Sequence, residues 1–338
     1  MKLTADYSLK KYNTFGIDVT ASLFATVFST DDLQYAYANK LFTQKHLLLG
    51  GGSNILFTKN FDGIVLKNAT QGIRVLEETD ESVLLQVASG ELWHRVVLYC
   101  VTNGWGGIEN LSLIPGTAGA APIQNIGAYG VELEQVLASV EVFDLSSGVS
   151  KILSVDACKF GYRDSIFKHE AKGKYFIQSI HLRLHKNAKP NVGYGALQQV
   201  LSEKNITHPG IQDISEAVIQ IRKSKLPDPA LLGNAGSFFK NPEITKTAFE
   251  TLRKEFPSAP GYNMLETGNV KVPAGWLIEQ CGWKGRRIGN TGAHKDQALV
   301  LVNYGGATGA EILALALQIQ DSVKQTFGIE IVPEVNII

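Results

Sequence analysis

Residues 46–54 read His46-Leu-Leu-Leu-Gly-Gly-Gly-Ser-Asn54, in which a short apolar run passes directly into three glycines and two small polar residues. The apolar run predicts a buried strand, and the glycines predict a loop whose backbone a ligand can approach closely. Upstream, the apolar residues 24–28 predict another strand, and Thr30-Asp31-Asp32 predicts the start of a helix between the two. The segment 24–54 is therefore expected to form a βαβ unit that ends in a glycine-rich loop.

The rest of the chain alternates helices with short strands. A helix is expected over 91–103, and several short alternating runs in the middle of the chain are typical of strands. The final helix is expected to run from a cap at Thr308 to a stop at Gly328. The last strand is expected over 329–338, with Glu334 on its polar face. The predicted fold class is α+β.

The composition argues against several classes of protein. The 32 basic residues balance 32 acidic residues, so no overall charge attracts nucleic acid or an anionic membrane. No uncharged apolar run reaches the roughly 18 residues of a membrane span, and the first residues lack the apolar core of a signal peptide. The three cysteines are too far apart for a disulfide framework or a metal site, and we expect them to be reduced. We therefore expect a cytoplasmic protein that binds no nucleic acid and no membrane.

Common nucleotide-binding and metal-binding motifs are absent from the sequence. No Gly-x-Gly pair completes Gly-x-Gly-x-x-Gly, no Gly-Lys-Ser/Thr phosphate loop occurs, and the seven histidines form no His-x-x-x-His pair, so no metal is predicted. The stretch 104–130 instead holds seven glycines and no Lys, Arg or His. A pyrophosphate bound there would contact backbone N–H groups and polar side chains such as Thr117, Gln124 and Asn125. Tight turns between strands would produce the same pattern.

Ser237 lies within Gly233-Asn-Ala-Gly-Ser-Phe-Phe-Lys-Asn-Pro242. The two glycines of this stretch allow a sharp turn that can present the Ser237 hydroxyl to a ligand, although a serine after glycine is also common in ordinary turns. Arg163 precedes Asp164 and could simply pair with it, and Glu334 could be a solvated carboxylate. A cofactor loop followed by a presented hydroxyl suggests redox chemistry that needs a proton donor.

Six motifs occur in one order along the chain. They are Gly50-Gly-Gly-Ser-Asn-Ile55, Ile114-Pro-Gly116 with Gln124-Asn-Ile-Gly-Ala-Tyr-Gly-Val-Glu132, Tyr162-Arg-Asp-Ser165, Gly233 to Pro242, Pro273-Ala-Gly-Trp-Leu-Ile-Glu-Gln-Cys281 and Pro333-Glu-Val335. Together they resemble the UDP-N-acetylenolpyruvoylglucosamine reductase family, flavoenzymes that make UDP-N-acetylmuramate for bacterial peptidoglycan. The resemblance runs from Asn13 to the carboxyl terminus. Tyr194, after a loop with Pro and Gly, looks like the extra tyrosine loop of the longer type I subtype.

The resemblance implies an FAD-binding fold of the vanillyl-alcohol oxidase (PCMH) type with an additional smaller α/β substrate-binding domain. At 338 residues the chain exceeds the roughly 250 to 300 residues at which a single core stops growing. The first FAD-binding part is expected over 1–70, joined by the C-terminal strand 329–338. The second is expected over 71–226 with a tyrosine loop near 185–200, and the substrate-binding domain over 227–328.

The resemblance also implies the residues of the site. Ser237 is expected to donate a proton, with Arg163 and Glu334 as the other catalytic residues. The expected FAD contacts are Gly50, Gly51, Gly52, Ser53, Asn54, Pro115, Gly116, Thr117, Gln124, Asn125, Gly127, Ala128 and Tyr129. The expected substrate contacts are Tyr194, Arg222, Lys225, Asn241, Lys284 and Gln297.

The implied activity is the NADPH-dependent reduction of the enolpyruvyl ether of UDP-N-acetylglucosamine by a monomer that carries FAD. No His or Cys lies between Val101 and Ala157, so FAD is expected to be bound non-covalently. Two alternatives stay open, namely another oxidase or dehydrogenase of the same flavin superfamily and a non-catalytic flavin-binding protein. Family members often carry a basic residue two positions after the catalytic glutamate, where this chain has Asn336. We expect that change to adjust flavin or carboxylate contacts only modestly.

Overall fold

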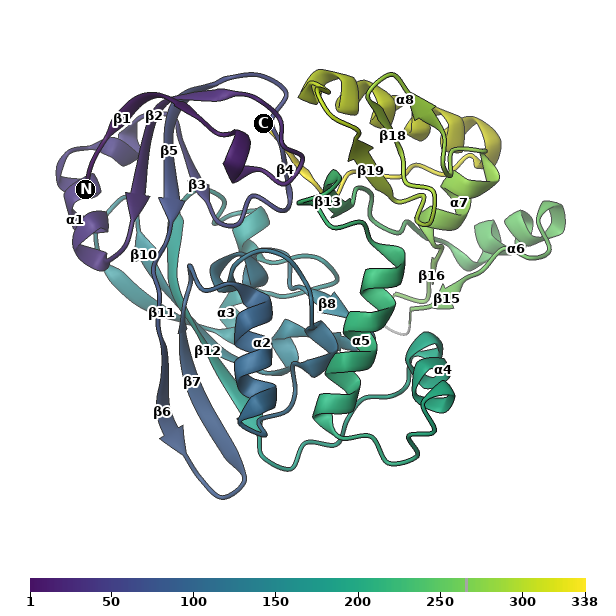
Figure 1. Cartoon of the computed structure of the whole chain (residues 1–338), viewed down its shortest axis with the longest axis horizontal. Coiled ribbons are helices and arrows are strands. Elements are labelled where there is room, and N and C mark those ends of the chain that lie inside the picture. The colour runs from purple at the N-terminus through teal and green to yellow at the C-terminus, as the bar shows by residue number, and fades with distance from the viewer. Residues whose placement is uncertain (265–266) are drawn as a thin grey trace. The chain divides into compact units, whose positions relative to one another are not determined.

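A computed structural model of the chain describes residues 1–264 and 267–338, which form two compact units (Figure 1). Unit 1 consists of Met1–Tyr7, Ala21–Gly51 and Phe61–Ser224. Unit 2 consists of Ser8–Thr20, Gly52–Asn60 and Lys225–Ile338. Two short amino-terminal segments therefore belong with the carboxyl-terminal third of the chain, and the glycine-rich loop 50–54 leads from unit 1 into unit 2.

The first sheet of unit 1 has four strands in the order β1-β2-β5-β3. Its strands are β1 (Thr4–Ser8), β2 (Thr20–Val27), β5 (Phe61–Asn68) and β3 (His46–Leu49). The predicted βαβ unit is confirmed, because β2 and β3 both run parallel to β5 and α1 (Thr30–Ala38) follows β2. Two details differ from the prediction. β5 lies between β2 and β3, and the side chain of Ser29 caps α1 by accepting a hydrogen bond from the Asp32 N–H.

The second sheet of unit 1 is antiparallel and has the order β11-β10-β12-β7-β6. Its strands are β6 (Ile73–Glu78), β7 (Ser82–Ala88), β10 (Leu137–Asp144), β11 (Ser150–Ser154) and β12 (Tyr175–His185). Every second residue of β7 is buried, and these residues share one core with the apolar face of α2 (Trp93–Thr102). The helix predicted over 91–103 and the predicted central strands are confirmed (Figure 1).

Unit 1 also contains a short hairpin and three further helices. They are β8 (Gly127–Ala128), β9 (Val131–Glu132), α3 (Val155–Cys158), α4 (Gly195–Glu203) and α5 (Ile211–Lys225), the last of which ends as unit 2 begins. α4 and α5 share a small core that includes Leu197, Leu201, Ile214 and Val218. This core holds α5 in place, and α5 carries two of the expected substrate contacts.

Unit 2 contains small sheets and the longest helix described. The sheets have the orders β13-β19-β18-β17, β14-β16-β15 and β20-β4. The strands are β4 (Ile55–Leu56), β13 (Gly233–Ser237), β14 (Glu243–Ile244), β15 (Tyr262–Asn263), β16 (Val270–Lys271), β17 (Arg287–Ile288), β18 (Thr291–Ala293), β19 (Val300–Asn303) and β20 (Asn336–Ile337). The helices are α6 (Lys246–Glu255), α7 (Ala274–Gln280) and α8 (Gly309–Phe327).

The predicted start of α8 at Thr308 and its predicted end at Gly328 are both confirmed. Thr308 and Glu311 form a capping box, and Gly328 ends the helix in the left-handed conformation with φ 67°. Every helix in the described part of the chain is too short or too polar to span a lipid bilayer.

The strand predicted over 329–338 is wrong in its extent. Only β20 is a strand, and it pairs with β4. Pro333, which has no N–H to donate, makes a single bridge with Phe239 and interrupts the run. Of the apolar residues in this run, Ile331 and Val335 are buried, whereas Ile337 is 40% exposed.

Candidate active site

Two glycine-rich segments of unit 1 lie in contact. A Cβ atom added at Gly51 would lie 2.9 Å from the Cα of Gly116, and one added at Gly50 would lie 2.7 Å from Oγ1 of Thr117. Gly52, the next residue, has φ 65° and a Cβ there would overlap the carbonyl oxygen of Tyr12. Only glycine therefore allows these backbones to approach so closely.

Unpaired donors remain at this contact. The Oγ1 atom of Thr117 is buried and has no hydrogen-bond partner. Within the described residues, the N–H group of Gly51 in the same unit also donates to no other group. A buried hydroxyl without a partner is costly unless a ligand pairs with it. Free N–H groups beside glycine backbone suit an anion, so these residues fit the pyrophosphate of FAD.

The β8–β9 hairpin is the other part of the stretch expected to contact FAD. Its turn residues Tyr129 and Gly130 have φ values of 52° and 82°, as a two-residue hairpin turn of type I′ requires. The side-chain amide of Asn125 donates to the carboxylate of Glu132 (2.8 Å) and the carbonyl of Gly161 (3.2 Å), so it serves to anchor this hairpin. The other expected contacts here are exposed or half-buried, namely Pro115, Gln124, Gly127 and Ala128.

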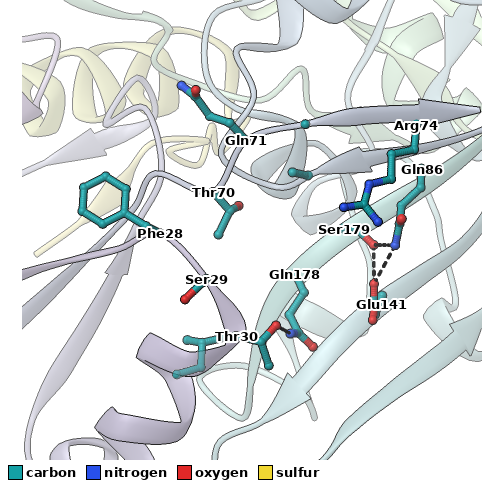
Figure 2. A pocket seen from close by; sticks show the side chains of 13 residues that line it. Phe28, Ser29, Thr30, Thr70, Gln71, Arg74, Gln86, Glu141, Gln178 and Ser179 are labelled. Atoms are coloured by element: carbon teal, nitrogen blue, oxygen red, sulfur yellow. Dashed lines mark hydrogen bonds between the residues drawn. The ribbon is translucent and has the colours of Figure 1, made fainter. Parts of the chain in front are cut away.

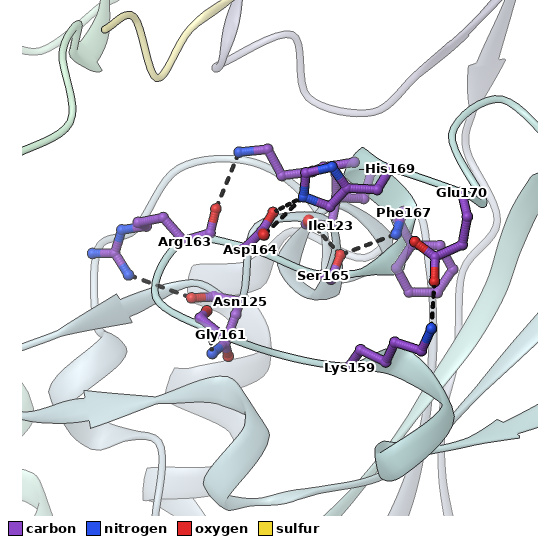
Figure 3. Close-up of polar contacts among 11 residues, drawn as sticks. Ile123, Asn125, Lys159, Gly161, Arg163, Asp164, Ser165, Phe167, His169 and Glu170 are labelled. Carbon is purple, nitrogen blue, oxygen red and sulfur yellow. Dashed lines mark hydrogen bonds and ion pairs between the residues drawn. The ribbon is translucent and has the colours of Figure 1, made fainter. Parts of the chain in front are cut away.

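Arg163 reaches the same hairpin from a separate turn, shown in Figure 3. Its φ of 53° is uncommon for a residue with a side chain. The guanidinium donates to the carbonyl oxygens of Asn125 (3.3 Å) and Gly127. The carboxylate of Asp164 instead accepts a hydrogen bond from Nε2 of His169 (2.8 Å), so the simple Arg163–Asp164 pair is not formed. Arg163 is thus directed to the stretch expected to bind FAD.

Two expected substrate contacts meet the hairpin turn. The Tyr194 ring meets the Tyr129 ring edge-on, with centroids 5.2 Å apart. The Arg222 guanidinium on α5 donates to the Tyr129 hydroxyl and, through Nε, to the carbonyl of Leu113 (3.2 Å). Burial lowers the pKa of Arg222 and raises the pKa of Tyr129. The positive charge of Arg163 acts on Arg222 as well, so unit 1 gathers two cations and two tyrosines.

In unit 2, hydrogen bonds join Glu334 to Phe238, the neighbour of Ser237, and to Asn54. The chain beyond β13 runs antiparallel to residues 332–334, and the N–H of Glu334 donates to the carbonyl of Phe238 (2.8 Å). Nδ2 of Asn54 donates to the carbonyl of Glu334 (3.4 Å). In this pairing Glu334 lies opposite Phe238, so it is offset by one residue from the position opposite Ser237.

The Ser237 hydroxyl is half-buried and bonds to no other residue of the described chain. Gly236, with φ 72°, sets the turn that precedes it. Asn336 donates its side-chain N–H to the carbonyl of Asn54 (3.0 Å). This side-chain amide therefore ties the glycine-rich loop to the carboxyl-terminal segment.

The other expected substrate contacts of unit 2 divide into two groups. Asn241 accepts a hydrogen bond from the N–H of Ala274 (2.9 Å), and Gln297 lies beside Gly275, so both amides lie at the start of α7. Lys284 forms an ion pair with Glu279 (2.9 Å). Lys225, the last residue of α5, is exposed.

A cavity of about 340 Å³ in unit 1 contains none of the expected site residues (Figure 2). Its polar side chains bond mainly to one another, for example Ser179 donating to Glu141 (2.6 Å) and Gln178 donating to Thr30 (2.9 Å). In the chain apart from residues 265 and 266, no cluster of three His, Cys, Asp or Glu side chains could hold a metal.

Sequence reasoning missed two residues that support Arg222. His94 accepts a hydrogen bond from the N–H of Leu113 (2.9 Å), whose carbonyl in turn accepts from Arg222. These bonds join residues that are 19 and 109 positions apart. No periodic pattern or motif spacing contains such a signal.

Comparison with known proteins identifies the family of the chain. The family profile for the FAD binding domain matches residues 21–153, and the profile for the UDP-N-acetylenolpyruvoylglucosamine reductase C-terminal domain matches residues 228–338. The reductase of that name from Flavobacterium johnsoniae is 47% identical over 100% of both chains, and that from Pseudomonas aeruginosa is 47% identical over 100% of this chain and 99% of the relative. The chain belongs to the UDP-N-acetylenolpyruvoylglucosamine reductase family. The prediction of the family and of an FAD-binding oxidoreductase is therefore confirmed.

A solved member of the UDP-N-acetylenolpyruvoylglucosamine reductase family has the same fold. The crystal structure of the enzyme from Thermus caldophilus matches with a TM-score of 0.69 and 23% identity, over 99% of this chain and 98% of that chain. The α+β fold class predicted from the sequence is therefore confirmed.

Proposed function

We propose that this chain reduces the enolpyruvyl ether of UDP-N-acetylglucosamine to UDP-N-acetylmuramate, a precursor of bacterial peptidoglycan, with NADPH as the reductant. The observation that carries the proposal is the 47% identity, over the whole chain, to relatives named UDP-N-acetylenolpyruvoylglucosamine reductase. The unpaired donors beside Gly51 and Thr117 support non-covalent FAD as the cofactor. When bound, FAD would pass hydride from NADPH to the vinyl carbon of the substrate.

Ser237 is the proposed proton donor. Reduction requires a proton at the carbon next to the substrate carboxylate, and the Ser237 hydroxyl has no partner within the described chain that would compete for it. A serine hydroxyl is a weak acid, so neighbouring groups must polarise it. We assign to Glu334 the ordering of groups around the developing enolate, and its backbone link to Phe238 supports that role.

Arg163 is proposed to fix the substrate carboxylate and to spread the negative charge that develops there. A guanidinium suits this role because it is planar and always charged. Its two bonds to the carbonyls of Asn125 and Gly127 hold the guanidinium beside the stretch expected to bind FAD.

The diphosphate and sugar are assigned to the remaining expected contacts. Arg222 and Lys225, three residues apart on α5, supply positive charge for the two phosphates. Tyr194, Asn241 and Gln297 supply hydrogen bonds, and Lys284 would have to leave Glu279 to take part. In this proposal, FAD is bound by residues 1–70 with 329–338 and by residues 71–226. The substrate is bound by residues 227–328 together with Tyr194, Arg222 and Lys225. A cytoplasmic monomer without nucleic-acid or membrane partners completes the proposal.

The test is anaerobic turnover with identified product. Purified protein with FAD should oxidise NADPH only when the enolpyruvyl sugar nucleotide is present, and mass spectrometry should find UDP-N-acetylmuramate. Acid precipitation should release all yellow colour from the polypeptide. An oxidase of the same superfamily would instead be reoxidised rapidly by oxygen, and a flavin carrier would show no turnover. Either result would refute the proposed function.

A further inference from the structure

Leu113 has a left-handed backbone with φ 58°, which costs a residue with a branched side chain about 1 kcal/mol or more. Hydrogen bonds on both sides maintain this conformation. Its N–H donates to Nδ1 of His94 (2.9 Å), and its carbonyl accepts from Nε of Arg222 (3.2 Å). Leu113 therefore links the two side chains through the two peptide units that flank its strained Cα.

The link continues beyond Arg222. The guanidinium of Arg222 donates to Tyr129, and the Tyr129 ring contacts the Tyr194 ring at 5.2 Å between centroids. Arg222 is thus oriented from one side by the Leu113 carbonyl and from the other by the Tyr129 hydroxyl. Loss of either acceptor would free a long side chain to adopt other rotamers.

His94 is itself rigidly placed at the start of α2. The N–H of its neighbour Trp93 donates to the carbonyl of Gly116 (3.1 Å), and the Trp93 indole N–H donates to the carbonyl of Leu111 (3.0 Å). Both carbonyls lie in the same loop as Leu113. The first turn of α2 and the loop 111–117 therefore hold His94 and Leu113 at a fixed distance.

The bond from Leu113 requires an imidazole that is neutral, with Nδ1 free of a proton. Burial is the largest effect that lowers the pKa of His94, followed by the charges of Arg222 and Lys223 on α5. The loop 111–117 holds no titratable side chain, so only a backbone N–H faces the ring from there. His94 consequently stays neutral at neutral pH and becomes protonated only at lower pH.

We propose that His94 is a positioning residue that, through the backbone of Leu113, holds Arg222 in the orientation needed to bind the substrate diphosphate. The proposal rests on the proposed function, because it takes Arg222 as a diphosphate contact. His94 touches neither the substrate nor the reacting atoms in this role.

The test compares His94→Leu, which lacks the acceptor, with His94→Asn, whose side-chain oxygen can accept from the Leu113 N–H without titrating. His94→Leu should raise KM for the enolpyruvyl sugar nucleotide about tenfold while kcat and bound FAD change little. His94→Asn should return KM to within about threefold of the unmodified protein. Because burial lowers the pKa of His94, KM should rise in the unmodified protein only as the pH falls below the ordinary histidine range, and it should stay flat in His94→Asn. His208→Leu, at an exposed histidine, is the matched control.

Calorimetric titration with UDP separates this inference from the proposed function. Weaker UDP binding by His94→Leu, with recovery in His94→Asn, supports the positioning role even if turnover is never observed. An unchanged KM and UDP affinity in His94→Leu would overturn it while leaving the enzyme assignment intact. Equal losses in His94→Leu and His94→Asn would also overturn it, because they would show general damage. If His94→Leu does not fold, the test rests on the pH dependence of KM in His94→Asn. A rise in KM at low pH in His94→Asn that equals the rise in the unmodified protein would refute the inference.

Discussion

Replacing Gly51 with alanine should weaken FAD binding without unfolding the protein. The added Cβ would lie 2.9 Å from Cα and 3.4 Å from the carbonyl carbon of Gly116. Carbon atoms in contact normally stay about 3.5 to 4.0 Å apart, so one segment must move by about 0.6 to 1.1 Å. Both atoms are backbone, and neither can rotate away as a side chain would.

The magnitude follows from the cost of that overlap. Inserting one methyl group into a packed contact costs about 1 to 3 kcal/mol. The segments that carry Gly51 and Gly116 can move apart when FAD is absent but must come together to bind it. Most of this free-energy cost therefore reduces the affinity for FAD. At about 1.4 kcal/mol for each tenfold change, the Kd for FAD should rise about 5- to 150-fold.

The assay is a fluorescence titration of the FAD-free protein with FAD. Gly195→Ala is the matched control, because a Cβ there would meet no atom within 4 Å and its φ is not in the left-handed region. Thermal melting of the FAD-free proteins should show similar midpoints for both variants. An FAD affinity for Gly51→Ala equal to that of Gly195→Ala would refute the role assigned to this contact.

Three further substitutions test separate parts of the molecule. Thr117→Val removes an unpaired buried hydroxyl, so it should slightly raise the free energy of unfolding of the FAD-free protein in urea. The same change should weaken FAD binding by about 1 to 3 kcal/mol. A loss of stability in both the FAD-free and the FAD-bound protein would contradict this prediction. Arg163→Lys keeps the charge but lacks the planar guanidinium whose two nitrogens reach the two carbonyls. It should lower kcat/KM about 10- to 100-fold in steady-state assays with FAD content unchanged, whereas loss of FAD would contradict its proposed role. Thr308→Ala removes the cap of α8, so it should lower the free energy of unfolding in urea by about 1 kcal/mol. An unchanged free energy of unfolding would contradict the stabilising role of the capping box.

Local signals in the sequence were sufficient for several elements. The caps of α8 at Thr308 and Gly328 follow from short-range hydrogen bonding and backbone freedom, which a few neighbouring residues decide. The strand β3 followed by the loop at Gly50 was predictable for the same reason. The expected contact residues Gly51 and Gly116 lie together because glycine is required wherever two backbones approach this closely.

Features that depend on distant residues could not be predicted. The expected strand over 329–338 shrinks to β20 because only β20 finds a partner, in the distant strand β4. Pro333, which interrupts the run, was the one local signal against the longer strand. The pairing of Asp164 with His169 depends on how the turn closes, which sequence neighbours do not decide. The left-handed backbone of Leu113 is invisible in the sequence, because leucine rarely adopts it and distant side chains maintain it.

The central claim is that Ser237 delivers the proton, and single-turnover kinetics of Ser237→Ala test it most directly. Under anaerobic conditions, reduction of the bound flavin by NADPH should stay within about twofold of the unmodified protein. Reoxidation by the enolpyruvyl sugar nucleotide should slow by about 10²- to 10⁴-fold, the range that a positioned proton donor contributes. Reoxidation within tenfold of the unmodified rate, or equal slowing of both half-reactions, would contradict the claim.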